Sequence, residues 1–403
     1  MKTVAIIGTF DSKGKEFLFL KSILEKFGLQ TLTIHSGAFE SAFEPDVSNA
    51  EVAAAAGVKI EAIVAKKDRG WATEVLSKGM VELLPKLYKE GKFDGVISLG
   101  GSGGTSLATP AMQEIPVGVP KIMVSTIAVG NTAEIVGTSD IMMMPSIVDV
   151  AGLNSISTKI FTNAAAAMAG MLNYESTEDV EHKPLLAATM FGVTTPCVDY
   201  ARAYLEKAGY EVLTFHATGV GGRAMESLID AGYIEGVLDL TTTEWCDEVV
   251  GGVLAGGPNR LEAAGRKGIP QVVSVGALDM VNYGAYETVP KEYAGRNLYK
   301  HNPMITLMRT SVDENKKIGE KIVEKLNMTT GPTAFFIPLK GVSMIDAEGQ
   351  PFYGPEEDQV LFDVLRNGLD QEAVEIIEMQ NHINDQAFAE AAAQRLLDML
   401  NKK

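Results

Sequence analysis

The sequence predicts an α/β protein with two Rossmann-like, doubly wound parallel-sheet domains that are related by internal duplication. Three observations predict this fold. Short β-branched runs alternate with helical patterns along the chain. A polar, acidic stretch at 174–183 ends at Pro184, after which the strand–helix pattern begins again. Segments of the two halves also match in the same order. The 403 residues therefore divide into an N-terminal domain, 1–178, and a C-terminal domain, 179–403.

The elements of the first half follow from its apolar patterns. Val4–Gly8 predicts a strand, and the apolar stripe of Glu16–Phe27 predicts a helix. Helical patterns over Asn49–Lys89 predict two helices, with a break near Lys67–Gly70. The other predicted elements are strands at Thr31–His35, Asp94–Leu99 and Lys121–Thr126, a short helix at Leu107–Met112 and an Ala-rich helix at Asn154–Leu172.

The second half repeats the pattern of the first, with a strand at Leu185–Phe191, a helix at Val198–Ala208 and a strand at Glu211–His216. Only the first half has a glycine-rich turn at Gly100, since the second has Thr241–Thr243 there. We interpret this difference as a ligand site that one half kept and the other lost or altered. The alternative to a duplication is that the halves are two α/β domains that share only the general alternation of strands and helices. The matching pairs are Leu24–His35 with Leu205–His216, Gly91–Leu99 with Gly232–Leu240, and Val124-Ser125 with Val273-Ser274.

Composition excludes several classes of protein. The formal net charge of −17 disfavours nucleic acid as a partner, because an acidic surface repels phosphates. No apolar run reaches the roughly 20 residues that cross a bilayer, and the N-terminus does not read as a signal peptide. Cys197 and Cys246 lack a metal or disulfide spacing and are interpreted as buried small residues in a reducing compartment. A cytoplasmic protein without a metal-ligand motif is expected.

The strongest site candidate is the glycine-rich turn between the strand at Asp94–Leu99 and the helix at Leu107–Met112. Its glycines expose backbone N–H groups, and the helix N-terminus adds positive potential, so the turn predicts a phosphate or carboxylate site. The turn contains no lysine and is not a Walker motif. The alternative is a tight crossover that binds nothing. The candidate residues are Gly100, Gly101, Ser102, Gly103, Gly104 and Thr105.

Turns after two other strands are expected to meet this one at the same edge of the sheet, because parallel strands share their carboxyl ends. Asp11 either caps a helix or binds a ribose hydroxyl or a magnesium-bound water. Lys13 either faces a phosphate or is simply exposed. The candidate residues are Gly8, Thr9, Phe10, Asp11 and Lys13 after the first strand, and Ser125, Thr126 and Gly130 after the Lys121–Thr126 strand.

In the second half, the candidates for catalysis are His216, Arg223 and Glu226, which follow a strand and open a helix. His216 is equivalent to His35, so the pair is either catalytic or engaged in local hydrogen bonds. Thr241–Glu248 is a candidate lining for an interdomain cleft. The run Met142–Met144 is interpreted as core filler.

Four segments together resemble the Tm-1-like ATP-binding family, uncharacterised bacterial relatives of the N-terminal region of the tomato mosaic virus resistance protein Tm-1. They are Gly8–Gly14, Gly100–Thr109, His216–Glu226 and Phe336–Ser343. The resemblance implies an ATP site in the glycine-rich half, with magnesium, and a homodimer. It supplies no reaction and no catalytic residues, so whether the protein is an enzyme stays open.

Two functions follow from these observations. The first is an ATP-binding protein whose nucleotide is held by the strand-end loops of the N-terminal domain, near the interdomain cleft. The alternative is a metabolic enzyme that acts on a phosphorylated or carboxylated small molecule in that cleft.

Overall fold

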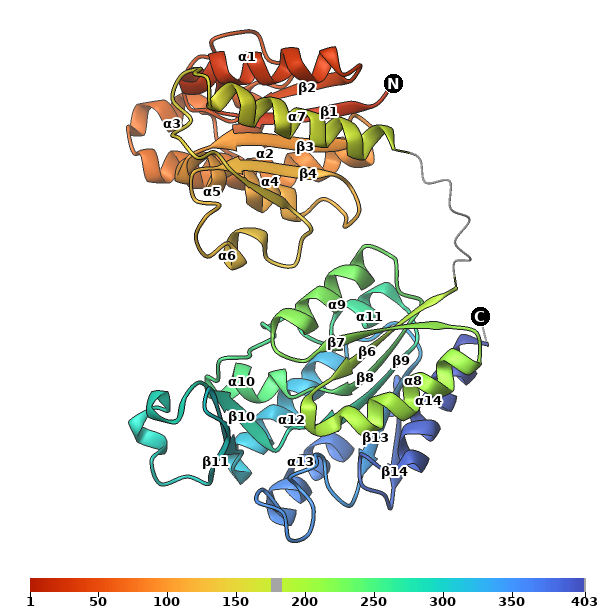
Figure 1. The fold of residues 1–403 in the computed structure, drawn as a ribbon. Coiled ribbons are helices and arrows are strands. Elements are labelled where there is room, and N and C mark those ends of the chain that lie inside the picture. Colours follow the sequence, from red (N-terminus) through yellow and green to blue (C-terminus); the bar gives the residue numbers. More distant parts are fainter. Residues whose placement is uncertain (175–182, 402–403) are drawn as a thin grey trace. The chain divides into compact units, whose positions relative to one another are not determined.

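The computed structural model describes residues 1–174 and 183–401 and divides the chain into two compact units, Met1–Asp179 and Val180–Lys403 (Figure 1). The predicted domain boundary after residue 178 and most of the predicted 174–183 linker lie outside the described residues. Each unit has a parallel sheet covered by helices, so the predicted α/β fold class is confirmed.

The described residues of the first unit contain a five-stranded parallel sheet in the order β2-β1-β3-β4-β5. The chain passes from β1 outward to β2, returns to the opposite side of β1 at β3, and continues in that direction. Winding therefore reverses between β1 and β3, which is where open α/β sheets bind ligands. The strands are β1 (Thr3–Gly8), β2 (Gln30–His35), β3 (Gly95–Gly100), β4 (Lys121–Ser125) and β5 (Met142–Pro145).

Helices cover both faces of this sheet, since alternate side chains of its strands join two separate apolar clusters. Val4 and Ile6 pack with the helices of one face, and Ala5 and Ile7 with those of the other. The first face carries α1 (Phe10–Lys26) and α7 (Ser157–Asn173); the second carries α2 (Asn49–Ala55), α3 (Ile60–Lys66), α4 (Arg69–Lys89) and α5 (Ser102–Gln113); and α6 (Ala133–Val136) precedes β5.

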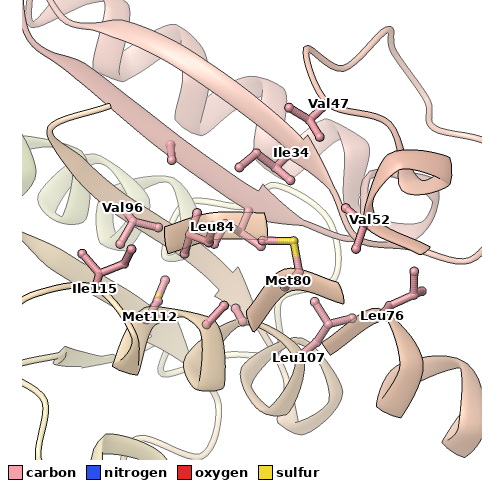
Figure 2. Close-up of a cluster of buried hydrophobic side chains, with 14 of the residues drawn as sticks. Ile34, Val47, Val52, Leu76, Met80, Leu84, Val96, Leu107, Met112 and Ile115 are labelled. Atoms are coloured by element: carbon pink, nitrogen blue, oxygen red, sulfur yellow. The ribbon is translucent and has the colours of Figure 1, made fainter. Parts of the chain in front are cut away.

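Figure 2 shows the cluster on the second face, where Met80 and Leu84 of α4 lie beside Leu107 and Met112 of α5. All four side chains are buried. This apolar contact fixes α4 and α5 next to each other. Both helices start at the carboxyl edge of the sheet, because α4 leads from that edge down to β3 and α5 leads away from β3.

We expect Met80→Ala to destabilise the first unit by about 2–5 kcal/mol, because the change removes a fully buried side chain and leaves a cavity. Urea unfolding followed by the fluorescence of Trp71, which belongs to this unit, measures the effect. Lys86→Ala changes an exposed position of the same helix and should cost less than about 0.5 kcal/mol. Equal stability of the two variants would contradict the packing in Figure 2.

Helix boundaries differ from the prediction in ways that matter for the site. The helix α1 begins at Phe10 rather than Glu16, and α5 begins at Ser102 rather than Leu107. Both predicted turns are therefore largely the first turns of helices. Asn49–Lys89 holds three helices rather than two, because a second break occurs at Gly57, whose φ is 72°.

The methionine run forms β5, which is the edge strand of the sheet. An edge strand has a neighbour on only one side, and Met142 is 44% exposed. The interpretation of this run as core filler is therefore wrong for Met142. Met143 and Met144 are partly buried and pack against the clusters on opposite faces.

The described residues of the second unit contain a six-stranded parallel sheet in the order β14-β13-β9-β8-β6-β7 and a three-stranded antiparallel sheet in the order β10-β12-β11. The strands are β6 (Leu185–Met190), β7 (Glu211–His216), β8 (Gly236–Thr241), β9 (Gln271–Gly276), β10 (Met280–Tyr283), β11 (Leu298–Asn302), β12 (Ile305–Arg309), β13 (Thr333–Pro338) and β14 (Val374–Met379).

Helices again cover both faces of the large sheet. One face carries α8 (Thr195–Lys207) and α14 (Gln386–Leu400). The other carries α9 (Val220–Asp230), α10 (Glu244–Val250), α11 (Ala263–Lys267), α12 (Val312–Leu326) and α13 (Pro355–Gly368). Short 3₁₀ helices are η1 (Gly192–Thr194), η2 (Tyr286–Thr288) and η3 (Lys291–Tyr293).

The strand order of the two large sheets supports the predicted duplication. Read from β7, the second sheet runs β7-β6-β8-β9-β13, which repeats the order β2-β1-β3-β4-β5. The three matching sequence segments fall on the equivalent pairs β2 and β7, β3 and β8, and β4 and β9. If the two domains shared only a general alternation of strands and helices, their matching segments would not be expected at the same positions of the two sheets.

The cysteines are free and buried, as the sequence predicts. Burial raises the pKa of both the Cys197 and the Cys246 thiol. Neither residue therefore offers a reactive thiolate at neutral pH.

Candidate functional site

The first turn of α5 lies at the point where the winding of the first sheet reverses. Gly100 ends β3, Gly101 is the N-cap of α5, and no side chain caps the helix. The first backbone hydrogen bond of the helix runs from Thr105 N–H to Gly101 O, at 2.9 Å. The N–H groups of Ser102, Gly103 and Gly104 therefore lack an acceptor within the helix. Such N–H groups, together with the helix dipole, can bind an anion, as the sequence predicts for this turn.

The glycines of this turn serve two different purposes. A Cβ on Gly100 would lie 2.9 Å from the Cα of Gly104, so Gly100 allows strand and helix to approach closely. A Cβ on Gly103 would meet nothing nearer than Nη2 of Arg69, at 3.7 Å. Close packing thus explains Gly100 but not Gly103. A glycine at position 103 leaves the backbone amides of this turn uncovered, as close approach of a ligand would require.

Two hydroxyls of the predicted site are used inside the protein. The Thr105 side chain is buried and donates to Gly101 O at 2.8 Å, and it lies 2.6 Å from the Ser125 hydroxyl. These contacts correct the prediction that Thr105 and Ser125 bind the ligand directly; they lock α5 to the end of β4. Ser102, by contrast, is exposed at the helix start.

The turn after β4 contributes one residue beside the glycine turn. Thr126 N–H donates to Gly100 O at 3.2 Å, and a Cβ on Gly101 would lie 3.6 Å from the Thr126 hydroxyl. The predicted convergence of these two turns is therefore observed. Gly130 is exposed and closes a local turn, in which its N–H donates to Ile127 O at 3.2 Å.

Most of the predicted residues after β1 have structural roles. Gly8 packs on the Phe17 ring, which lies 2.1 Å from the position of a Gly8 Cβ. The Phe10 side chain is fully buried, stacked on His35 and Phe43. The prediction that Phe10 binds a nucleotide is corrected accordingly. Thr9, half-buried at the start of α1, stays at the edge between β1 and β3.

The two charged candidates after β1 are held by other loops. The Asp11 carboxylate accepts the Phe39 N–H at 3.0 Å, which ties it to the turn after β2, on the side of β1 away from β3. The Lys13 ammonium donates to the carbonyl of Val150. The helix-cap interpretation of Asp11 is wrong, since the N-cap of α1 is Thr9. The interpretation of Asp11 and Lys13 as ligand-binding residues stays a prediction, although each side chain already has a partner within the protein.

Sequence reasoning missed Arg69, which brings a positive charge to the site. Arg69 is the first residue of α4, is exposed, and places Nη2 beside Gly103. The first turn of α4 holds no acidic residue, and an arginine there opposes the helix dipole. That unfavourable placement, inside the break predicted at Lys67–Gly70, is the signal that could have identified it.

In the second unit, the amides at the start of α9 are bound by the protein's own carboxylate. Gly219 and Gly222, at the start of α9, donate their N–H groups to Oε1 of Glu244 at 2.6 and 3.1 Å. Glu244 is fully buried and begins α10, directly after β8. When the ungapped match of the two halves is continued, Glu244 stands opposite Gly103. The second half therefore has a carboxylate side chain where the first has a glycine, and that carboxylate binds the amides of α9 rather than those of its own helix.

Arg260 neutralises this carboxylate in a buried network. Its guanidinium binds Glu244 through Nε at 2.6 Å and Asp239 through both Nη atoms, at 2.5 and 2.7 Å. Glu226 joins through Nη1 at 3.3 Å and also accepts the N–H groups of Leu261 and Ala263. Burial raises the pKa of Glu226. These contacts correct the prediction that Glu226 closes on a ligand, because both of its oxygens hold the chain around Arg260.

The other catalytic candidates have separate surroundings. His216 is exposed and packs beside the Phe191 ring, with 5.4 Å between ring centroids, whereas its equivalent His35 is buried and its Nδ1 accepts the Phe10 N–H at 3.1 Å. The two histidines thus occupy equivalent strand ends but differ in environment. Arg223 donates to Ala255 O at 2.9 Å.

Most of the Thr241–Glu248 segment is enclosed within the second unit. All residues from Thr241 to Asp247 are buried, which corrects the prediction that they line a cleft, whereas Glu248 is half-buried and borders a surface groove together with the edge of Trp245.

A second buried network surrounds Arg309. Its guanidinium binds Asp358 at 2.7 Å and lies 3.6 Å from Asp346, while the Ser343 hydroxyl donates to the fully buried Asp279 at 2.7 Å. Burial, and then the charge of Asp346, raises the pKa of Asp279 to about 7 and that of Asp358 to about 8. One guanidinium thus faces three carboxyl groups, and the pKa values of two of them are raised toward neutral pH.

These pKa values predict that the second unit loses stability as the pH rises. A carboxyl group whose pKa is raised by folding contributes stability that is complete below its unfolded pKa, about 4, and is lost as the pH passes its folded pKa. The free energy of unfolding should therefore fall between about pH 4 and 8. Urea unfolding at pH 5 and pH 8.5, followed by Trp245 fluorescence, measures the fall, and Asp279→Asn should reduce it. Asp363→Asn, at an exposed site, is the control; an equal fall in both variants would contradict the prediction.

Two further features are absent from the described residues, 1–174 and 183–401. No helix in them is long and apolar enough to pass through a membrane. They contain no group of three or more histidine, cysteine, aspartate or glutamate side chains placed to hold a metal ion.

Comparison with known proteins gives matches over both units. The N-terminal domain of an uncharacterised protein family, UPF0261, matches residues 2–177, and its C-terminal domain matches residues 183–400. A UPF0261 protein of Clostridium tetani is 56% identical over 402 residues, covering all of both chains. The tomato protein named ToMV resistance protein Tm-1(GCR237) is 46% identical over 340 residues, which are 83% of this chain and 45% of that protein. The predicted resemblance is confirmed.

Solved structures are only distantly similar to this chain. The UDP-GlcNAc 2-epimerase of Methanocaldococcus jannaschii aligns with 91% of this chain and 100% of its own, with 11% identity and a TM-score of 0.25. The UDP-N-acetylglucosamine 2-epimerase of Rickettsia bellii aligns with 68% of this chain and 78% of its own, with 11% identity and a TM-score of 0.23. Similarity at this level says nothing about the ligand.

Proposed function

The chain belongs to the uncharacterised protein family UPF0261, and we propose that its first unit binds ATP, with the phosphates at the N-terminus of α5. The proposal depends on one arrangement at the point where the winding of the sheet reverses, between β1 and β3. There, three N–H groups at Ser102–Gly104 lack an acceptor within the helix, and the Arg69 guanidinium lies beside them. Amides at a helix start and an arginine are the groups that proteins use for phosphate oxygens. They concentrate positive potential on a chain whose net charge is −17.

ATP, rather than another anion, follows from the resemblance to the Tm-1-like ATP-binding family. The segments Gly8–Gly14 and Gly100–Thr109, which carry that resemblance, begin at the ends of the neighbouring strands β1 and β3 and continue into α1 and α5. Both segments therefore lie at the same edge of the sheet, where one nucleotide could contact both of them.

Magnesium accompanies ATP in this proposal. Magnesium in nucleotide sites commonly keeps several waters and is held by phosphates with one or two protein oxygens. Because Asp11 is engaged by Phe39 and the described residues hold no metal cluster, the phosphates and water would hold the ion. The ion would neutralise part of the phosphate charge.

A binding role is favoured over catalysis by the residues of the second unit. Glu226 is bound to Arg260 and two backbone amides, and Arg223 is bound to a backbone carbonyl. Both oxygens of Glu226 are therefore engaged within the protein, which removes it from the catalytic candidates and leaves the exposed Arg223 and His216. The proposal also includes a homodimer, from the resemblance, and a cytoplasmic location, which the two free, buried cysteines support.

Calorimetric titration with Mg-ATP tests the proposal. We expect one ATP per chain, and we expect Arg69→Ala to weaken binding by about tenfold to a hundredfold, the value of a charge-assisted hydrogen bond. Lys89→Ala removes the same charge from the far end of α4 and is the control. Absence of ATP binding at millimolar concentration would refute the proposal, and equal affinity of the two variants would place the site elsewhere. Release of ADP, measured in parallel, would instead favour the enzyme alternative.

A further inference from the structure

A groove with a volume of about 720 Å³ lies on the outer side of α4, bordered by the end of α2 and by α5. Its volume is within the usual range of small-molecule sites, about 300–1,000 Å³. The residues of α4 that line it, such as Thr73, Ser77 and Val81, are only half-buried. They differ from the residues that α4 turns toward the sheet, among them Leu76 and Met80 in Figure 2.

The chemistry of the groove suits an uncharged group that donates hydrogen bonds. Small apolar side chains at Ala56 and Pro110 contribute to its walls, and hydroxyls line it at Thr73, Ser77 and Ser106. Its charged residues are Glu74, Glu82 and Lys78, and the lysine is already paired with Glu74 at 2.7 Å. The groove therefore carries a net negative charge. Carboxylates accept hydrogen bonds from amines and hydroxyls but repel phosphates.

One end of the groove borders the proposed phosphate site. Gly70 lines the groove and follows Arg69, whose guanidinium lies beside Gly103. Ser106 lines the groove from α5, and its hydroxyl donates to Gly103 O at 3.1 Å. A molecule could thus present an anionic end to the first turn of α5 and a neutral end to the groove without crossing an intervening element.

We propose that this groove holds the nucleoside of the bound nucleotide: the base lies against the small apolar residues, and Glu74 and Glu82 accept from amino and ribose hydroxyl groups. The inference rests on the proposed function, because it takes the phosphates to lie at Ser102–Gly104. It assigns recognition of the base and the sugar to residues of α4 and of the end of α2. These residues lie outside the glycine-rich segments that carry the family resemblance.

The test compares ATP with inorganic tripolyphosphate, which has the same charged end and no nucleoside. Ser77→Phe places a ring in the middle of the groove and should weaken Mg-ATP binding at least tenfold while leaving tripolyphosphate binding unchanged. Ala55→Phe fills the groove from the opposite wall and should have the same selective effect. Lys86→Phe, at an exposed position of α4 that does not line the groove, is the matched control and should bind both ligands normally.

The outcomes separate the two proposals. If the unaltered protein binds neither ATP nor tripolyphosphate, the proposed phosphate site is wrong. If it binds both, and Ser77→Phe and Ala55→Phe keep full ATP affinity, the groove proposal alone is overturned. It is also overturned if both variants, folded as judged by circular dichroism, lose ATP and tripolyphosphate to the same extent, because the groove would then not be a separate subsite.

Discussion

Gly103→Val is expected to weaken ATP binding more than a hundredfold while the first unit stays folded. The space around this position admits a side chain, since a Cβ would meet only the Arg69 guanidinium at 3.7 Å. The valine methyl groups would, however, cover the amides of the first turn of α5 and displace the arginine. Loss of two or more charge-assisted hydrogen bonds, each worth about 1.5–3 kcal/mol, accounts for the size of the effect.

A matched glycine provides the control for this experiment. Gly170 of α7 is exposed, and a Cβ there would meet nothing within 4 Å. Gly170→Val should leave the affinity for ATP unchanged, as measured by the same calorimetric titration. If Gly103→Val bound ATP as tightly as Gly170→Val, the phosphates could not lie at the start of α5, and the proposed site would be wrong.

Arg260→Met should destabilise the second unit by about 3–5 kcal/mol, the effect of removing one partner from a buried ion pair. Arg260 is 1% exposed and is the cation shared by Asp239, Glu244 and Glu226. Methionine has a similar length but leaves the three carboxyl groups without a counter-charge, and burying an uncompensated carboxylate is costly.

The chain offers a convenient measurement, since it has two tryptophans, one in each unit. In a Trp71→Phe background, the fluorescence of the buried Trp245 reports urea unfolding of the second unit alone. Arg266→Met is the control, because that arginine is exposed and paired with Asp230 at the surface. Its loss should cost at most about 1 kcal/mol. Similar midpoints for the two variants would show that the network around Arg260 is not a major source of stability.

The sequence was sufficient to predict the parts of the fold that depend on local pattern. Runs such as Val4–Gly8 must be buried on both faces, and a buried parallel sheet requires crossover helices. The matches between the halves then predicted that β2 and β7, and β3 and β8, hold equivalent positions, and the sheets agree. The position of the glycine turn at the edge of the sheet followed from the same reasoning.

The sequence was not sufficient where a side chain's partner lies far along the chain. The sequence places Phe10 in a predicted turn, but its contacts with His35 and Phe43 make it part of the hydrophobic core of the first unit. Arg260 and Asp239 are 21 residues apart, and no spacing rule indicates their pairing. Arg69 reaches the site only because the apolar faces of α4 and α5 pack together, which is a tertiary effect.

The carboxylate of Glu244 gives the second half of the molecule a property that the first half lacks. The amides at the start of α9 are already bound by this permanent anion, which is part of the chain, so they are not available to a free phosphate or carboxylate. The first half has a glycine, Gly103, at the position equivalent to Glu244 and so lacks this built-in anion. In the proposed function, the first half alone therefore keeps a helix start that is open to an exchangeable anion.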